Sequence, residues 1–231
     1  MKKLRSAYVE KPIHGRRLVI SDIHGCSKTF KKLLKQVELT KDDQLFILGD
    51  AINKGPHSDK VLNRILKLKA QGYSVFFLRG NHEQIILNTK NKALGQQKRI
   101  LKSLKALNLL EGKTINPTYF ELLKKSFHFI ETDKHFLVHA GFNDKENTYL
   151  DKKAMLQIRS FEYDAILFKN KQIIVGHTPL TFEKIQKRIN KKKAIICIDN
   201  GCVNFNTEGQ GKLICFNLDE NTIHTQSYCE A

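Results

Sequence analysis

The chain alternates between short apolar runs and longer segments with helical spacing. Apolar runs with β-branched residues, each followed by a polar or glycine-containing turn, predict buried strands at residues 18–21, 44–48, 74–78 and 136–140. Between the first three runs, apolar positions recur with helical spacing at residues 30–37 and 61–68. Strand, helix and strand in alternation predict a parallel sheet.

The second half of the chain contains four more strand-like runs, at residues 172–176, 194–199, 212–218 and 222–226. Only short turns separate the last of them, so we expect this half to be largely antiparallel. Residues 88–127 differ, because Ile100, Leu101 and Leu104 have helical spacing and Pro117 opens another helical stretch. We expect a helical insertion at about 88–127 that lies beside the site and shapes substrate access.

These elements predict an α/β fold, on the border of α+β, with a two-sheet β-sandwich core flanked by helices. The length of 231 residues and the hydrophobic content of 41% allow one well-packed core. No internal repeat or low-complexity linker divides the sequence. We therefore expect residues 1–231 to form a single domain.

The formal net charge of +17, from 40 Lys and Arg against 23 Asp and Glu, favours anionic partners. The lysine clusters are dispersed and are not interleaved with aromatic residues, which favours a solvated surface over a nucleic-acid partner. The five cysteines form no paired C-x-x-C, which is typical of reduced thiols. Without a signal-peptide pattern or a run of eighteen apolar residues, we expect a cytoplasmic protein with no membrane partner.

Metal-ligand residue types follow the predicted strands, at the point where each strand ends. The carboxyl ends of neighbouring parallel strands meet at one edge of a sheet, so these side chains should lie close together. Carboxylates, imidazoles and an amide oxygen are ligands for divalent cations. The candidates are Asp22, His24, Asp50, Asn81, His139 and His177.

The motifs D-x-H-G, G-D, G-N-H-E, H-A-G and G-H-T-P, in this order, resemble the calcineurin-like metallophosphoesterase superfamily, and its phosphoprotein phosphatase branch in particular. The match runs from about residue 18 to residue 218 and includes the block at 198–202. The resemblance implies a four-layer αββα fold and two divalent metal ions, with manganese favoured and iron or zinc as alternatives. It makes Asp22, His24 and Asp50 ligands of one ion, and Asp50, Asn81, His139 and His177 ligands of the other, with Asp50 as the bridge.

In such a site, two ions about 3.5–4 Å apart activate a water that attacks phosphorus in line. His82 lies outside the ligand set and is the candidate general acid, with Asp50 and Asn53 as the other catalytic residues. Arg79, Arg159 and Lys54 are candidates to hold the phosphate. The family's G-D-x-x-D-R-G is changed here to Asn53 and Lys54 at its two polar positions; Asn53 can still accept a hydrogen bond from His82 but lacks the charge that favours imidazolium.

The first functional hypothesis is a metal-dependent, serine/threonine protein phosphatase-like phosphomonoesterase that acts on a phosphorylated protein or small phosphoester. The second is a dinucleoside polyphosphate hydrolase, because residues 53–58 also resemble the N-R-G-P-x-S of symmetrical diadenosine tetraphosphate hydrolases. The third is a non-catalytic binding protein on the same fold, suggested by Asn53, Lys54 and the basic surface. The sequence indicates no oligomeric state.

Overall fold

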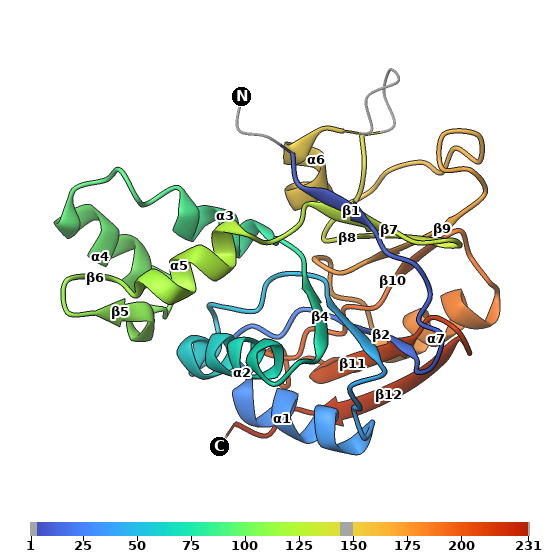
Figure 1. Ribbon diagram of the computed structural model, residues 1–231, viewed down its shortest axis with the longest axis horizontal. Coiled ribbons are helices and arrows are strands. Elements are labelled where there is room, and N and C mark those ends of the chain that lie inside the picture. The colour runs from blue at the N-terminus through green and yellow to red at the C-terminus, as the bar shows by residue number, and fades with distance from the viewer. Residues whose placement is uncertain (1–3, 144–149, 231) are drawn as a thin grey trace.

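Two five-stranded sheets lie face to face in the computed structural model, which describes residues 4–143 and 150–230 (Figure 1). One sheet has the order β12 (Thr222–Ser227), β11 (Lys212–Asn217), β2 (Arg17–Ile20), β3 (Gln44–Ile47) and β4 (Ser74–Phe77). The other has the order β1 (Ser6–Tyr8), β7 (Phe129–Glu131), β8 (His135–Val138), β9 (Gln172–Val175) and β10 (Ile195–Cys197). We call these the β2 sheet and the β8 sheet.

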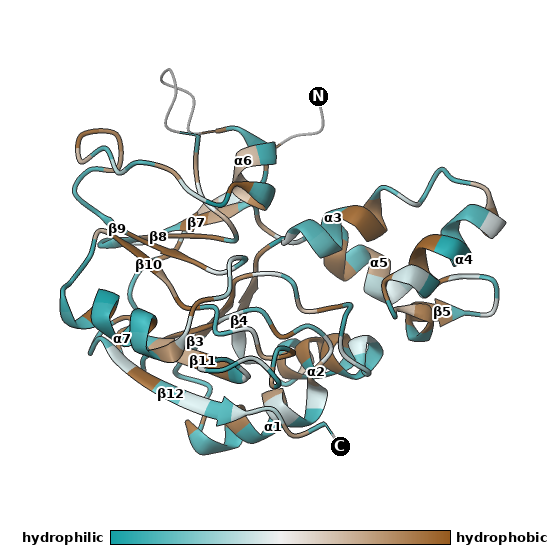
Figure 2. Ribbon diagram, turned by 180° about the vertical axis from the view of Figure 1, so that it is seen from behind, coloured by the Kyte–Doolittle hydropathy of each residue, from teal (hydrophilic) through white to brown (hydrophobic). Residues whose placement is uncertain are grey.

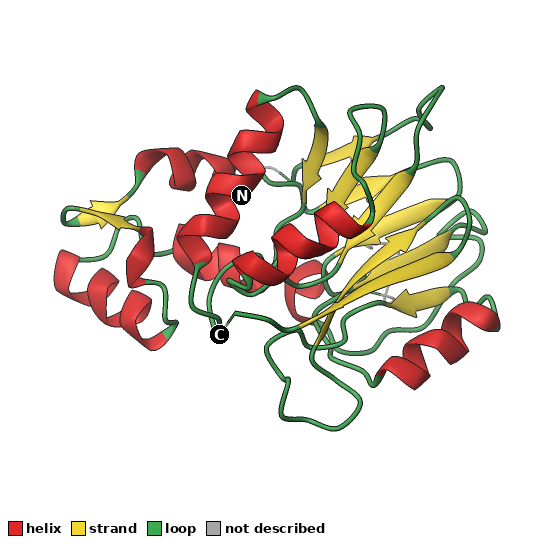
Figure 3. Cartoon of the chain, turned by 90° about the horizontal axis from the view of Figure 1, so that it is seen from below, coloured by secondary structure: helices red, strands yellow, loops and turns green. Residues whose placement is uncertain are grey.

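Helices cover the outer faces of the sandwich, as Figure 3 shows from below. Helices α1 (Ser27–Gln36) and α2 (Ser58–Ala70) pack on the β2 sheet. On the other side, α6 (Lys152–Gln157) places Met155 against the outer face of the β8 sheet, and α7 (Phe182–Asn190) packs beside β10. The expected two-sheet core flanked by helices is thereby confirmed.

Alternation along the strands explains why two apolar layers form. In β2, Leu18 and Ile20 join the cluster under α1 and α2, whereas Val19 joins the cluster between the sheets, with Ile174 and Phe216. Successive side chains of a strand point to opposite faces, so a strand that is apolar throughout must be covered on both sides. Figure 2 shows β8, β9 and β10 as mostly hydrophobic and the helices as mixed.

The strand directions agree with the sequence prediction in the first half and correct it in the second. Strands β2, β3 and β4 are parallel, and β11 pairs antiparallel with both β12 and β2. Strands β8, β9 and β10 are parallel to one another, so the expectation of a largely antiparallel second half was wrong there. The reason is α7, which was not predicted and which supplies the crossover that parallel neighbours require.

Residues 81–124 form a separate group of elements to one side of the sandwich (Figure 1). They comprise α3 (Asn81–Leu87), α4 (Leu94–Ser103), the 3-10 turn Leu107–Leu109, the hairpin β5 (Leu110–Glu111) and β6 (Thr114–Ile115), and α5 (Pro117–Lys124). The Lys54 amide donates to the Leu104 carbonyl at 3.2 Å, which ties this group to the loop after β3. Among the described residues, no helix is both long enough and apolar enough to traverse a bilayer.

Candidate metal centre

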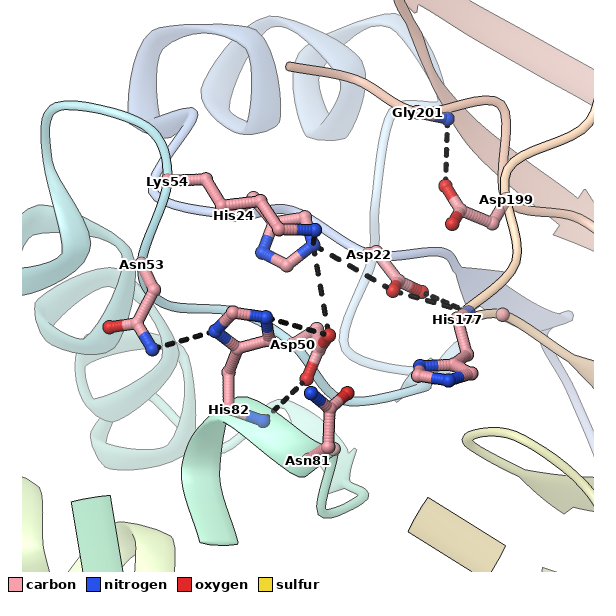
Figure 4. Close-up of polar contacts among 12 residues, drawn as sticks. Asp22, His24, Asp50, Asn53, Lys54, Asn81, His82, His177, Asp199 and Gly201 are labelled. Carbon is pink, nitrogen blue, oxygen red and sulfur yellow. Dashed lines mark hydrogen bonds and ion pairs between the residues drawn. The ribbon is translucent and has the colours of Figure 1, made fainter. Parts of the chain in front are cut away.

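The six predicted ligand residues converge at one end of the sandwich, and both sheets contribute. Asp22 and His24 follow β2, Asp50 follows β3, and Asn81 follows β4 as the first residue of α3. His139 and His177 follow β8 and β9 of the other sheet. The Asp50 Oδ2 atom is central: it lies 3.7 Å from His24 Nε2 (Figure 4). It also lies 3.6 Å from His139 Nε2.

Main-chain carbonyls fix the tautomers of two of the histidines. His24 donates from Nδ1 to the Ile52 carbonyl at 3.1 Å, and His139 donates from Nδ1 to the Leu48 carbonyl at 3.0 Å. Because a carbonyl can only accept, the Nε2 atom of each neutral ring keeps its lone pair and turns it toward the cluster. This is the arrangement in which a histidine binds a metal.

The unprotonated Nε2 atom of His139 lies close to other atoms that can donate a lone pair to a metal. His139 Nε2 lies 3.0 Å from Asn81 Oδ1 and 3.1 Å from His177 Nδ1. Two groups of residues can each enclose a cation, namely His24, Asp50 and His82, and Asp50, His139 and His177. Mixed nitrogen and oxygen donors at such short separations fit divalent transition metals.

Three buried carboxylates concentrate negative charge at this point. Burial raises the pKa of Asp22 well above its ordinary value, and the charges of Asp199 and Asp50 raise it further. Burial likewise raises the pKa of Asp50, followed by the effect of Glu83. Asp199, whose pKa burial raises to about 6, was not among the predicted site residues, although it is the last residue of the strand-like run at 194–199. A bound cation would compensate this crowded charge.

Glu83 is a second residue that the sequence did not identify as part of the site. Its buried carboxylate accepts from the amides of Asp50 at 2.8 Å, Ala51 at 3.0 Å and Gly80 at 2.7 Å. It therefore fixes the loop after β3 relative to the start of α3. Its place in the Gly-Asn-His-Glu motif was the available signal.

Several site residues have unusual backbone conformations. His24, Asp50 and His177 have φ values of 47°, 45° and 66°, in the left-handed region that non-glycine residues rarely adopt. The Asp50 carbonyl accepts from the His24 amide at 2.8 Å, and Asp22 accepts from the His177 amide at 3.1 Å. Such conformations cost about 1–3 kcal/mol each and persist where surrounding contacts enforce them, often at functional sites.

Gly176 permits the close approach of the two sheets at the site. A Cβ atom there would lie 2.1 Å from Asp22 Oδ1. The approach places the amide of His177 on the Asp22 carboxylate. A side chain at position 176 would therefore displace a candidate ligand.

His82 stands at the rim of the cluster with Asn53 behind it. The Asn53 amide nitrogen lies 2.8 Å from His82 Nδ1, and His82 Nε2 lies 3.8 Å from Asp50 Oδ2 (Figure 4). The sequence suggested that Asn53 accepts from His82; the structure instead presents the amide NH2 as a donor to Nδ1. Burial lowers the pKa of His82 to about 4, with further effects from Lys54 and His177.

The three predicted phosphate-holding residues have different positions. Lys54 Nζ lies 2.8 Å from His24 Nε2, and the charge of Arg159 contributes to the lowered pKa of His177, after the larger effect of burial. Arg79 does not join them: its guanidinium donates to Ser126 Oγ at 3.0 Å and to the Lys124 carbonyl at 2.9 Å. The short distance in sequence from Arg79 to Asn81 gave no indication that the side chain turns toward the end of α5.

Sequence comparison places the whole constellation in a known context. The family model described as calcineurin-like phosphoesterase matches residues 15–214. Curated relatives named bis(5'-nucleosyl)-tetraphosphatase, symmetrical, include that of Wigglesworthia glossinidia brevipalpis, 38% identical over 39% of this chain and 34% of its own length. Another, from Buchnera aphidicola subsp. Baizongia pistaciae, is 27% identical over 67% of this chain and 62% of its own length. The chain thus spans less than two thirds of either relative.

Solved structures share the fold at low sequence identity. A candidate diadenosine tetraphosphatase superimposes with a TM-score of 0.70 at 19% identity, covering 99% of this chain and 100% of its own. A protein serine/threonine phosphatase from Saccharomyces cerevisiae, similar to human phosphatase PP5, gives a TM-score of 0.63 at 14% identity, covering 99% and 84%. At these identities the likeness shows the fold alone.

Proposed function

This chain belongs to the calcineurin-like phosphoesterase family of metal-dependent hydrolases, and from that premise we propose that it cleaves phosphoanhydride bonds of dinucleoside polyphosphates. The observation that carries the choice of substrate is the neutral Asn53 amide on His82 Nδ1. The relatives' names agree with this choice.

The donor set fits two divalent ions, with manganese as the proposed metal. Asp22, His24 and Asp50 would hold one ion, and Asp50, Asn81, His139 and His177 the other. When bound, such ions supply a nucleophilic hydroxide at neutral pH and neutralise phosphate oxygens. The protein's part is to present unprotonated Nε2 atoms and to keep Asp50 oriented through the amide of His82, which donates to its Oδ1 at 3.0 Å.

Two cations are placed to hold phosphate oxygens. Lys54 is exposed but reaches His24 at the edge of the cluster, and Arg159 is exposed beside His177. Lys54 acts beside His24 and Arg159 beside His177, and in this proposal a phosphate above the cluster contacts both. We leave Arg79 out of this set because its donors are occupied by α5 and by Ser126.

The leaving group decides which substrate suits His82. An alkoxide from serine is strongly basic and needs a proton, whereas a nucleoside diphosphate is a weak base and leaves without one. A carboxylate beside Nδ1 would favour the imidazolium that delivers this proton, and Asn53 is neutral. Bound dications would disfavour the imidazolium further. The pair of His82 and Asn53 therefore suits cleavage of a phosphoanhydride better than cleavage of a phosphoserine.

A cavity beside His177 has room for the rest of such a substrate. It has a volume of about 500 Å³, begins at Arg159 and Gly176, and is walled by the Phe161 ring. Arg188 and Lys193 lie at its border, and its described wall contains no carboxylate. A planar base with attached phosphates matches this combination of aromatic wall and positive charge.

The test is turnover of diadenosine tetraphosphate with manganese, followed by chromatography. We expect ADP as the main product, with kcat/KM at least tenfold above that for a phosphoserine peptide. Parallel reactions with iron and zinc identify the preferred metal. Absence of ADP under all three metals would refute the proposal.

A second candidate function is a protein phosphatase-like phosphomonoesterase, favoured by the Arg-Gly-Asn-His-Glu sequence at residues 79–83. Two residues of this sequence, Asn81 and His82, lie in the cluster, and Glu83 accepts hydrogen bonds from the main chain around Asp50. The phosphoserine peptide in the same assay decides between the two. A peptide rate above the dinucleotide rate would establish this second function.

A further inference from the structure

A second positively charged cavity lies behind α3, away from the candidate ligands. Its volume is about 690 Å³, and it is bordered by α3, α5 and the segment before β1. The Asn81 and His82 end of α3 belongs to the metal centre, whereas Gln84 and Asn88, further along the same helix, line this cavity. Among the described residues, no histidine, aspartate or glutamate lines it, so no described side chain in its wall is a typical ligand for a divalent ion.

Four cations surround this cavity: Arg5, Arg79, Lys90 and Lys124. Within the described part of the chain, only Lys124 has an acidic partner, Glu121 at 3.2 Å, and that pair is exposed to solvent. An exposed pair of this kind neutralises little of the field. The cavity therefore keeps a net positive charge, which the Glu83 carboxylate offsets only in part, at Arg79.

Arg79 is the deepest of these cations. It is only 8% exposed, and its contacts are neutral acceptors: Ser126 Oγ, Gln84 Oε1 at 3.2 Å and carbonyls near the end of α5. Burial lowers the pKa of Arg79; the charge of Glu83 acts against this, and the charge of Arg5 lowers the pKa further. A buried guanidinium held by neutral acceptors gains from an anion nearby.

The cavity also offers groups that recognise more than charge. The Phe120 ring is half-buried in its wall, with Lys90 Nζ 5.4 Å from the ring centroid. Asn88 and Asn91 add amide donors and acceptors. The volume lies within the range of 300–1,000 Å³ that is usual for small-molecule sites.

We propose that this cavity is a second anion site, independent of the metal centre, which binds a polyphosphate chain. The chain could be that of a nucleoside triphosphate or an inorganic one. In either case the phosphates would lie among Arg5, Lys90 and Lys124, above the buried Arg79. A nucleoside would in addition place its base on Phe120.

The experiment is equilibrium binding of ATP and of tripolyphosphate to the full chain, in 150 mM salt with excess chelator. The chelator removes divalent ions, so that metal-dependent binding at the catalytic site does not contribute. The pocket variant is Arg5→Gln with Lys90→Gln. The matched control is Lys31→Gln with Lys32→Gln, two exposed lysines on α1 whose loss changes the net charge equally.

We expect the pocket variant to weaken binding at least tenfold and the control to change it less than twofold. Loss of ATP affinity in Phe120→Leu, with tripolyphosphate unchanged, would identify a nucleotide as ligand; unchanged affinity for both would identify the phosphate chain alone. Equal weakening in the pocket and control variants would overturn the site, because binding would then follow net charge. Failure of the wild-type protein to bind either ligand at millimolar concentration would also overturn it.

Discussion

Replacing Asn53 with Asp tests whether His82 lacks a charge that would make it an effective acid. The new carboxylate would stand about where the amide now lies, 2.8 Å from His82 Nδ1. An opposite charge this close raises a histidine pKa by about 1–3 units. Asp also tolerates the left-handed conformation of this position, where φ is 71°.

The magnitude follows from the His82 pKa of about 4. In the metal-free protein at pH 7, about one imidazole in a thousand is then protonated, and a rise of the pKa by about two increases this to about one in ten. The population of imidazolium thus rises about a hundredfold, but the raised pKa also makes the imidazolium a weaker acid. If about half of the gain, on a logarithmic scale, reaches the rate, kcat rises about tenfold. This gain should be full above the new pKa and should shrink as the pH falls from the new pKa toward that of the wild-type imidazole, where both rings are protonated.

The assay compares kcat for a phosphoserine peptide with kcat for p-nitrophenyl phosphate, whose leaving group is weakly basic. In Asn53→Asp we expect about a tenfold gain on the peptide and less than twofold on the nitrophenyl ester. Adding His82→Asn should remove the gain, since the carboxylate acts through the imidazole. Equal factors on both substrates, or a gain that survives without His82, would refute the reasoning.

Three further predictions concern the metal centre. Manganese should raise the Tm, measured by calorimetry, more at pH 8 than at pH 5. Because burial raises the pKa of Asp199 to about 6, its protonated form stabilises the metal-free protein below that pKa, and this contribution is lost as the pH rises through it. At pH 8 a bound cation can take the place of the lost proton. Asp50→Asn should abolish both the manganese effect on Tm and turnover, yet raise the Tm of the metal-free protein at pH 8, because one of three crowded carboxylates is gone; a lower metal-free Tm would contradict this. Gly176→Ala should raise the manganese concentration for half-maximal activity at least tenfold, as its Cβ would meet Asp22 Oδ1 at 2.1 Å, whereas Gly95→Ala, with open space around it, should leave that concentration unchanged.

The sequence predicted the eight main strands because each is a compact apolar run that ends at a turn. It failed on β1, β7 and α7, since β1 and β7 have three residues each and are too short to show a period, and α7 was passed over between two strand-like runs. The direction of β10 was consequently wrong. Local patterns do not reveal which sheet edge a strand joins when the connecting helix is missed.

At the site, residue types at strand ends were enough to bring six candidate ligands together. The side-chain directions were not predictable in the same way. Arg79 and Arg159 are both arginines near motif residues, but the carbonyls at the end of α5 draw one of them away from the cluster. Asp199 was overlooked because it is the single acidic residue among neutral ones at residues 198–202. Its effect on the pKa of Asp22 becomes evident only when the fold brings the two carboxylates together.

The division of donors between two sheets has a consequence for how this enzyme loses activity. Asp22, Asp50 and Asn81 belong to one sheet and His139 and His177 to the other, so neither half can assemble the centre by itself. Turnover therefore reports the alignment of the sandwich. A slight sliding of one sheet over the other, through weakened packing at Ile174 or Phe216, would silence hydrolysis while leaving the strand content, as seen by circular dichroism, intact.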